Sequence, residues 1–133
     1  HLAPTEGLPS NVAAPVIDKL FPPGATSRLP IIAISGTNGK TTTTRLISHM
    51  AKIKRYKYGY TTSDGVYIKN RLLMKGDCTG PQSAEFVLKD PTVNFAVLEC
   101  ARGGMLRAGL AFPSCDVGIV TNVSADHLGL KGI

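Results

Sequence analysis

The stretch that decides the fold is "ISGTNGKTTTTRL", Ile34 to Leu46, which joins a short apolar run to a segment with helical periodicity. The apolar run, residues 30–35, is rich in β-branched residues, as is typical of a buried parallel strand. A strand, a glycine-rich turn, a Lys-Thr pair and a helix in this order form the context of a phosphate-binding loop. The stretch therefore predicts a nucleotide site.

Each residue of this loop has an expected role. Gly36 and Gly39 allow a tight turn whose backbone N–H groups point at phosphate oxygens, and the following helix adds its positive end. Lys40 is placed to reach the β- and γ-phosphates, and Thr41 to ligate Mg²⁺. The usual pattern G-x-x-x-x-G-K-[ST] has glycine where this chain has Ile34, so the match is to a shorter form. We expect ATP and Mg²⁺ to be held by Gly36, Thr37, Asn38, Gly39, Lys40, Thr41 and Thr42.

The competing interpretation is a glycine turn and helix start without a ligand, which leaves the lysine unexplained. Of the four successive threonines, Thr43 and Thr44 are interpreted as ordinary first-turn residues whose hydroxyls bond to nearby backbone.

Strand and helix patterns alternate after the loop. Leu46, Ile47, Met50 and Ile53 fall on one helical face, the pattern of an amphipathic helix. Strands are expected over residues 56–63, 93–100 and 115–123, a hairpin over 65–74, and helices over 81–90 and 105–110. This order predicts an α/β fold with an open, mostly parallel sheet.

The chain of 133 residues fits one domain. Residues 1–29 hold five of the nine prolines, so we expect an interdomain linker there, with one short helix over residues 11–21. The nucleotide-binding domain is then expected over residues 30–133.

Composition excludes several classes of partner. The net charge is +6, and the densest basic run, residues 52–60, is interpreted as a solvated helix end, since no RNA- or DNA-binding signature accompanies it. No apolar run is long enough to span a membrane. Three cysteines without C-x-x-C spacing indicate reduced thiols and no zinc site. We expect a cytoplasmic protein that binds neither nucleic acid nor membrane.

Glu99 ends the strand expected over residues 93–100. Ligands of open parallel sheets bind at the carboxyl ends of strands, so this carboxylate is expected to face the loop and to ligate Mg²⁺. The alternatives are an exposed strand-end carboxylate or a partner for Arg102.

Further polar residues follow other expected strands and turns. Ser63 and Asp64 are candidate substrate contacts, or plain turn residues. Thr79 either caps the next helix or touches a bound substrate. Arg102 and Arg107 flank two glycines, and they either hold carboxylates of a substrate or are solvated surface cations.

The loop "SGTNGKTTT" resembles the nucleotide loop of the Mur ligase superfamily, the ATP-dependent amide ligases of cell-wall precursor and folylpolyglutamate synthesis. The stretches "GYTTSDGVYI", "LECARGGMLRAGL" and "CDVGIVTNVSADHLGLKGI" resemble, within it, ligases that join arginine to aspartate side chains of an aspartate-rich polymer. The resemblance implies that ATP converts a carboxylate to an acyl phosphate, which an amine attacks to give an amide.

The resemblance also implies site residues. Lys40, Glu99 and His127 would be catalytic, and Glu99 and His127 would bind metal. Asn122 would line the site and contact the nucleotide, and Asp126 would line the site or serve as a partner of a metal ligand. A ligase of this type needs the rest of its sheet and a further domain, and its full-length form is expected to be a homo-oligomer. We therefore expect this chain alone to be a C-terminally truncated, inactive part of such an enzyme. A ligase with a cell-wall or folate acceptor, and a nucleotide-binding module without ligase chemistry, remain alternatives.

Overall fold

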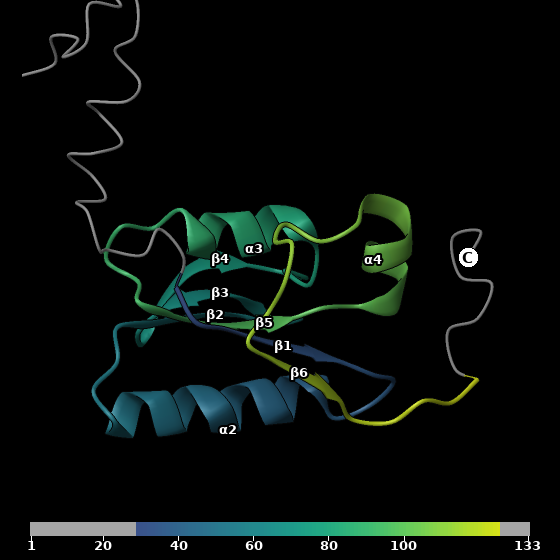
Figure 1. Cartoon of the computed structure of the whole chain (residues 1–133), viewed down its shortest axis with the longest axis horizontal. Helices are drawn as coiled ribbons and strands as arrows, with labels where there is room; N and C mark the ends of the chain where they lie inside the picture. Colours follow the sequence, from purple (N-terminus) through teal and green to yellow (C-terminus); the bar gives the residue numbers. More distant parts are fainter. Residues whose placement is uncertain (1–28, 126–133) are drawn as a thin grey trace, which may run out of the picture.

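The computed structural model describes residues 29–125, which form a six-stranded sheet with helices on both faces (Figure 1). The expected helix over residues 11–21 lies outside the described residues, as do Asp126 and His127. The elements are β1 (Ile31–Ser35), α2 (Lys40–Ile53), β2 (Tyr58–Thr61), β3 (Gly65–Ile68), β4 (Arg71–Lys75), α3 (Pro81–Leu88), β5 (Phe95–Glu99), α4 (Arg102–Ala108) and β6 (Val117–Val120).

The strand order is β4-β3-β2-β5-β1-β6. Strands β2, β5, β1 and β6 are parallel, and the hairpin of β3 and β4 continues the sheet in antiparallel fashion. Helix α2, which follows β1, lies on one face of the sheet, and α3, which follows the β3–β4 hairpin, lies on the other (Figure 1). The predicted α/β class with an open, mostly parallel sheet is confirmed, and β5 lies between the strands that lead into the loop and into the β2–β3 turn.

The apolar core lies between the sheet and α3. Buried side chains from β3, β5 and α3, among them Val66, Leu98 and Val87, form one cluster. Helix α3 packs directly on β2 because Gly59 has no side chain: a Cβ there would lie 2.8 Å from Cγ1 of Val87. This contact fixes the helix that precedes β5.

Helix α2 turns a different face to the sheet than its apolar spacing indicates. The buried residues of α2 are Thr44, Ser48 and Ala51. Thr44 Oγ1 donates to the Lys40 carbonyl at 2.8 Å and Ser48 Oγ to the Thr44 carbonyl at 2.7 Å, so these hydroxyls are buried without needing partners in the sheet.

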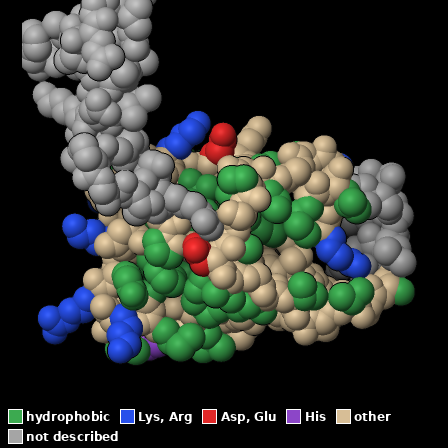
Figure 2. Space-filling view, in the orientation of Figure 1, with side chains coloured by type: hydrophobic (Ala, Val, Ile, Leu, Met, Phe, Trp, Pro, Cys, Tyr) green, Lys and Arg blue, Asp and Glu red, His purple; other side chains and the backbone are tan. Residues whose placement is uncertain are grey.

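The apolar stripe of α2 is exposed instead. Leu46, Met50 and Ile53 are 57–64% exposed, and Val117 and Val120 of the edge strand β6 are exposed as well. Figure 2 shows hydrophobic side chains along the lower side of the view, where Figure 1 places α2 and β6. Small side chains on the inner face allow α2 to lie close to the strands that carry the loop. Among the described helices, none has the length and apolar character required to cross a membrane.

Replacing Val87 by alanine tests the packing of α3. Val87 is fully buried, so Val87→Ala is expected to lower the free energy of unfolding by about 2 kcal/mol in urea denaturation. The control Gln82→Ala, on the exposed side of the same helix, should change it by less than about 0.5 kcal/mol. Equal effects would show that this helix does not pack as described.

Candidate functional site

A cleft of about 560 Å³ opens at the carboxyl ends of β1, β2 and β5. The phosphate loop, defined as residues 36–42, forms one wall, and the start of α4 forms another. The cleft is lined by all seven residues of the phosphate loop and by Ser63, Asp77, Thr79, Glu99, Ala101, Arg102, Gly103, Leu106 and Arg107. The structure thus brings together most of the residues that the sequence predicts for the site, from four separate segments of the chain.

Two glycines shape the phosphate loop. Gly36 has φ +129° and Gly39 has φ +85°, values that residues with a side chain rarely adopt. A Cβ on Gly36 would lie 2.2 Å from Oγ1 of Thr121, so the loop passes directly against the end of β6. Gly39 is the N-cap of α2 and offers no side-chain cap, which leaves the first N–H groups of the helix suited to an anion.

Lys40 lies folded against the loop. Its Nζ donates to the carbonyls of Gly36 at 2.9 Å and Thr37 at 3.1 Å. This places one cation within the wall of the cleft, where a phosphate group would compete with the two carbonyls for the ammonium.

The end of β6 holds the phosphate loop in place. Thr37 N donates to the Asn122 carbonyl at 3.0 Å, and Asn38 N donates to Oδ1 of Asn122 at 3.0 Å. Asn122 Nδ2 returns a bond to the Asn38 carbonyl at 3.0 Å, and Thr121 Oγ1 donates to the same oxygen at 2.6 Å. Asn122, predicted as a nucleotide contact, therefore directs its amide group at the loop backbone, a supporting role that the sequence pattern did not indicate.

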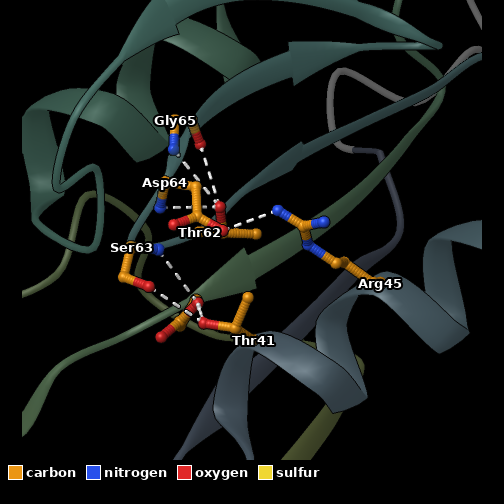
Figure 3. A network of polar contacts seen from close by, with 7 residues as sticks. Thr41, Arg45, Thr62, Ser63, Asp64 and Gly65 are labelled. Atoms are coloured by element: carbon orange, nitrogen blue, oxygen red, sulfur yellow. Dashed lines mark hydrogen bonds and ion pairs between the residues drawn. The ribbon is translucent and has the colours of Figure 1, made fainter.

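Glu99 lies at the centre of the site. Its side chain is 3% exposed, and Oε2 accepts hydrogen bonds from Thr41 Oγ1 at 2.9 Å and from Ser63 N at 3.2 Å (Figure 3). Oγ of Ser63 lies 3.0 Å from Oγ1 of Thr41. The Thr41 hydroxyl has one proton and gives it to Glu99, so it accepts the proton of Ser63. The alternative of an exposed strand-end carboxylate is wrong.

Burial raises the pKa of Glu99 above its usual value. The hydrogen bonds from Thr41 and Ser63 and the charge of Lys40 oppose this shift, and Asp77 adds to it. A divalent cation would favour the ionised form, and the oxygens of Thr41, Ser63 and Glu99 are the hard ligands that Mg²⁺ prefers. Within residues 29–125, no group of three His, Cys, Asp or Glu side chains is arranged to hold a metal, so hydroxyl and phosphate oxygens would complete the coordination.

Cys100 follows Glu99 but is not a nucleophile candidate. Burial raises the pKa of its thiol to about 11, so the thiol stays protonated at neutral pH.

The other side chains predicted as substrate contacts differ in whether they line the cleft and in what they bond to. Asp64 is not among the lining residues and accepts a hydrogen bond from Arg45 at 2.6 Å. Thr79 lines the cleft and donates to Asp77 at 2.7 Å; the idea that it caps the next helix is wrong, since Gly80 is the N-cap of α3. Arg102 lines the cleft and donates to the Ser124 carbonyl at 3.3 Å.

Sequence reasoning overlooked Asp77 and Arg45. Asp77 follows Gly76, a glycine at φ +125° that turns the chain toward the cleft, and no local pattern marks such a residue. Arg45 stands four residues after Thr41, which places both on the same face of α2, and this spacing was a usable signal.

An open sheet whose strand ends meet a glycine-rich loop and a buried carboxylate defines an α/β domain with its ligand crevice at the carboxyl edge. Within this class the chain belongs to the Mur ligase family: the model of the Mur ligase middle domain matches residues 34–132. The resemblance noted from the sequence is confirmed.

Similar proteins agree with this assignment. Cyanophycin synthetase of Synechocystis sp. is 62% identical and that of Crocosphaera subtropica 65% identical, over 100% of this chain and 15% of each relative. The chain therefore spans about 15% of the length of these relatives. A solved UDP-N-acetylmuramoyl-L-alanyl-D-glutamate–2,6-diaminopimelate ligase superposes with a TM-score of 0.64 at 26% identity, covering 88% of this chain and 24% of that one.

Alanine substitutions at three glycines distinguish the stability cost of a steric clash from the cost of an unfavourable backbone φ. Gly36→Ala meets Thr121 and has an unfavourable φ, so it should cost about 3 kcal/mol of stability. Gly39→Ala has open space and only the backbone strain, about 1 kcal/mol. Gly80→Ala has open space, φ −97° and no backbone strain, so it should lose only the preference of an N-cap for glycine over alanine, less than about 1 kcal/mol in urea denaturation. Equal costs at Gly36 and Gly80 would contradict the loop geometry.

Replacing Glu99 by glutamine tests its burial. The folded-state pKa is raised, so the folded protein binds the proton more tightly than the unfolded chain. Without ligand, the free energy of unfolding should fall as pH rises from the ordinary glutamate pKa through the raised one. Glu99→Gln should remove this fall and be more stable than the wild type at neutral pH. Thermal melts from pH 4 to 8 check this; parallel pH profiles for both proteins would contradict it.

Proposed function

We propose that this chain is the nucleotide-binding part of an ATP-dependent ligase that joins an amine to a carboxylate. The observation that carries the proposal is the buried Glu99 carboxylate, bonded to Thr41 and Ser63 beside the phosphate loop. Burying a carboxylate costs free energy, and a bound cation would offset that cost. Its burial at this position therefore favours a cation-binding role over a purely structural one. The family assignment agrees with this chemistry.

The chain's own residues bind and orient the reactants. The backbone of residues 36–42 and Lys40 hold the phosphates of ATP, and Asn122 keeps the loop in its conformation. Thr41 and Glu99 would hold Mg²⁺, which supplies charge neutralisation for the transferred phosphoryl group. Transfer of the γ-phosphoryl group to the acceptor carboxylate gives an acyl phosphate and ADP, and attack by the amine then releases phosphate.

The acceptor side of the cleft is cationic. Arg102 and Arg107 of α4 line it opposite the phosphate loop. Arg107 lies against its own helix, since a Cβ on Gly103 would be 3.0 Å from Nη2 of Arg107. These guanidinium groups suit an acidic acceptor, and Thr79 and Ser63 add hydroxyls to the same cleft. We infer an acceptor rich in aspartate.

Similarity to the cyanophycin synthetases supports arginine as the amine, joined to aspartate side chains of the polymer. His127 and Asp126, by the family motif, would contribute a second metal site, and residues 1–29 would link this domain to a preceding one. We also propose a cytoplasmic, homo-oligomeric full-length enzyme.

Arginine-dependent ADP release by the full-length protein, given ATP, Mg²⁺ and an aspartate-rich primer, tests the proposal. Lys40→Met and Glu99→Gln should each lower this release at least about 100-fold. The reason is that Lys40 directly, and Glu99 through the magnesium ion, would stabilise the negative charge of the phosphoryl group during its transfer. Lys89→Met, at the exposed C-cap of α3, is the control and should keep full activity.

Two results would contradict the proposal. Release that depends on diaminopimelate instead of arginine would favour the amine substrate named for the superposed ligase. Release that survives Lys40→Met and Glu99→Gln would show that this site performs no phosphoryl transfer.

A further inference from the structure

The β2–β3 turn, defined as residues 62–65, lies over the site and is held by α2 at two successive positions. Ser63 contacts Thr41 and Glu99, and its neighbour Asp64 contacts Arg45 (Figure 3). Thr41 and Arg45 are four residues apart, so both project from one face of α2. Two consecutive turn residues are thus paired with two consecutive positions on that helix face.

The turn is tied together and to the segment after β4 by backbone and side-chain hydrogen bonds. Thr62 Oγ1 accepts from Asp64 N at 3.0 Å and from Gly65 N at 3.3 Å. Gly76 N donates to the Asp64 carbonyl at 2.9 Å, and Cys78 N donates to the Thr62 carbonyl at 3.0 Å. A restraint on Asp64 is therefore transmitted to Ser63 and to the neighbouring segment that carries Asp77.

Arg45 and Asp64 do not line the cleft. Their side chains are 50% and 56% exposed, with Arg45 Nη2 and Asp64 Oδ2 2.6 Å apart. The guanidinium also lies 6.0 Å from the ring centre of Tyr67 on β3, which limits where it can move. The pair is therefore placed to act on the site through the turn and not by touching a ligand.

We propose that Arg45 and Asp64 are a pair of positioning residues that hold Ser63 against Thr41 and Glu99. The pair fixes the oxygens of these three residues before magnesium-ATP binds, which reduces the ordering that binding requires. The inference rests on the proposed function, because it concerns the same magnesium-ATP site. It gives Asp64 a role through Ser63 in place of the direct substrate contact expected from the sequence.

The test measures magnesium-ATP binding to the full-length protein by isothermal titration. The binding heat that remains in Lys40→Met is subtracted, so that only binding at this site is compared. Arg45→Ala and Asp64→Ala should each raise the magnesium concentration for half-maximal ATP binding about threefold, the effect expected of an exposed pair. The double variant should also show about threefold, because the two act as one unit. Arg45→Lys should restore most of the affinity.

The matched control is Glu85→Gln, which removes another exposed ion pair, Glu85–Lys89 at 3.7 Å on α3. It should leave the magnesium dependence unchanged. In steady-state assays the Arg45 and Asp64 variants should raise the apparent KM for magnesium-ATP more than they lower kcat, a split that a general loss of stability does not produce.

Two results would overturn the inference. One is an unchanged magnesium dependence in Arg45→Ala, as in Glu85→Gln. The other is a double variant whose effect is the product of the single effects, about ninefold. If magnesium-ATP binding shows no signal that depends on Lys40 and Glu99, the proposed function itself fails, and this outcome is distinct from the first two.

Discussion

The carboxylate of Glu99 is the interaction on which the rest of the site depends. It stands at the end of β5, between the strands that lead into the phosphate loop and into the β2–β3 turn, and it bonds to both segments at once. A buried carboxylate costs free energy, and only hydrogen bonds or a cation offset that cost. The parallel order of the strands therefore has a chemical consequence: it brings one acid, two hydroxyls and one lysine to a single edge.

The two segments bonded to Glu99 are themselves supported from outside the cleft. The end of β6 holds the phosphate loop through Thr121 and Asn122, and this contact requires a glycine at position 36. Helix α2 restrains the β2–β3 turn through Arg45 and Asp64. Support by residues that touch no ligand is how a fold keeps reactive groups within narrow tolerances.

Much of the fold was predictable, because alternating apolar runs and turn residues specify a parallel sheet with little ambiguity. The phosphate loop and Glu99 were predictable for the same reason: each stands at the end of a recognisable strand. The burial of α2 was not predictable from spacing, since Leu46, Met50 and Ile53 have the periodicity of a core face but lie exposed. The roles of Asn122 and Asp77 depend on contacts between distant segments, which no local pattern encodes. The spacing of Arg45 from Thr41 placed both on one helix face, but the pairing of Arg45 with Asp64 depends on such a distant contact as well. His127 stays a prediction, because it lies outside the described residues.

The central claim is that Thr41 and Glu99 hold a divalent cation beside the phosphates of ATP. A crystal structure of the protein with Mn²⁺ and a non-hydrolysable ATP analogue, with anomalous diffraction to locate the metal, tests it most directly. The account predicts a manganese peak at ligand distance from Oγ1 of Thr41 and beside the Glu99 carboxylate, with Lys40 Nζ moved from the carbonyls of Gly36 and Thr37 to a phosphate oxygen. An analogue bound elsewhere, or a bound metal that contacts neither Thr41 nor Glu99, would contradict it.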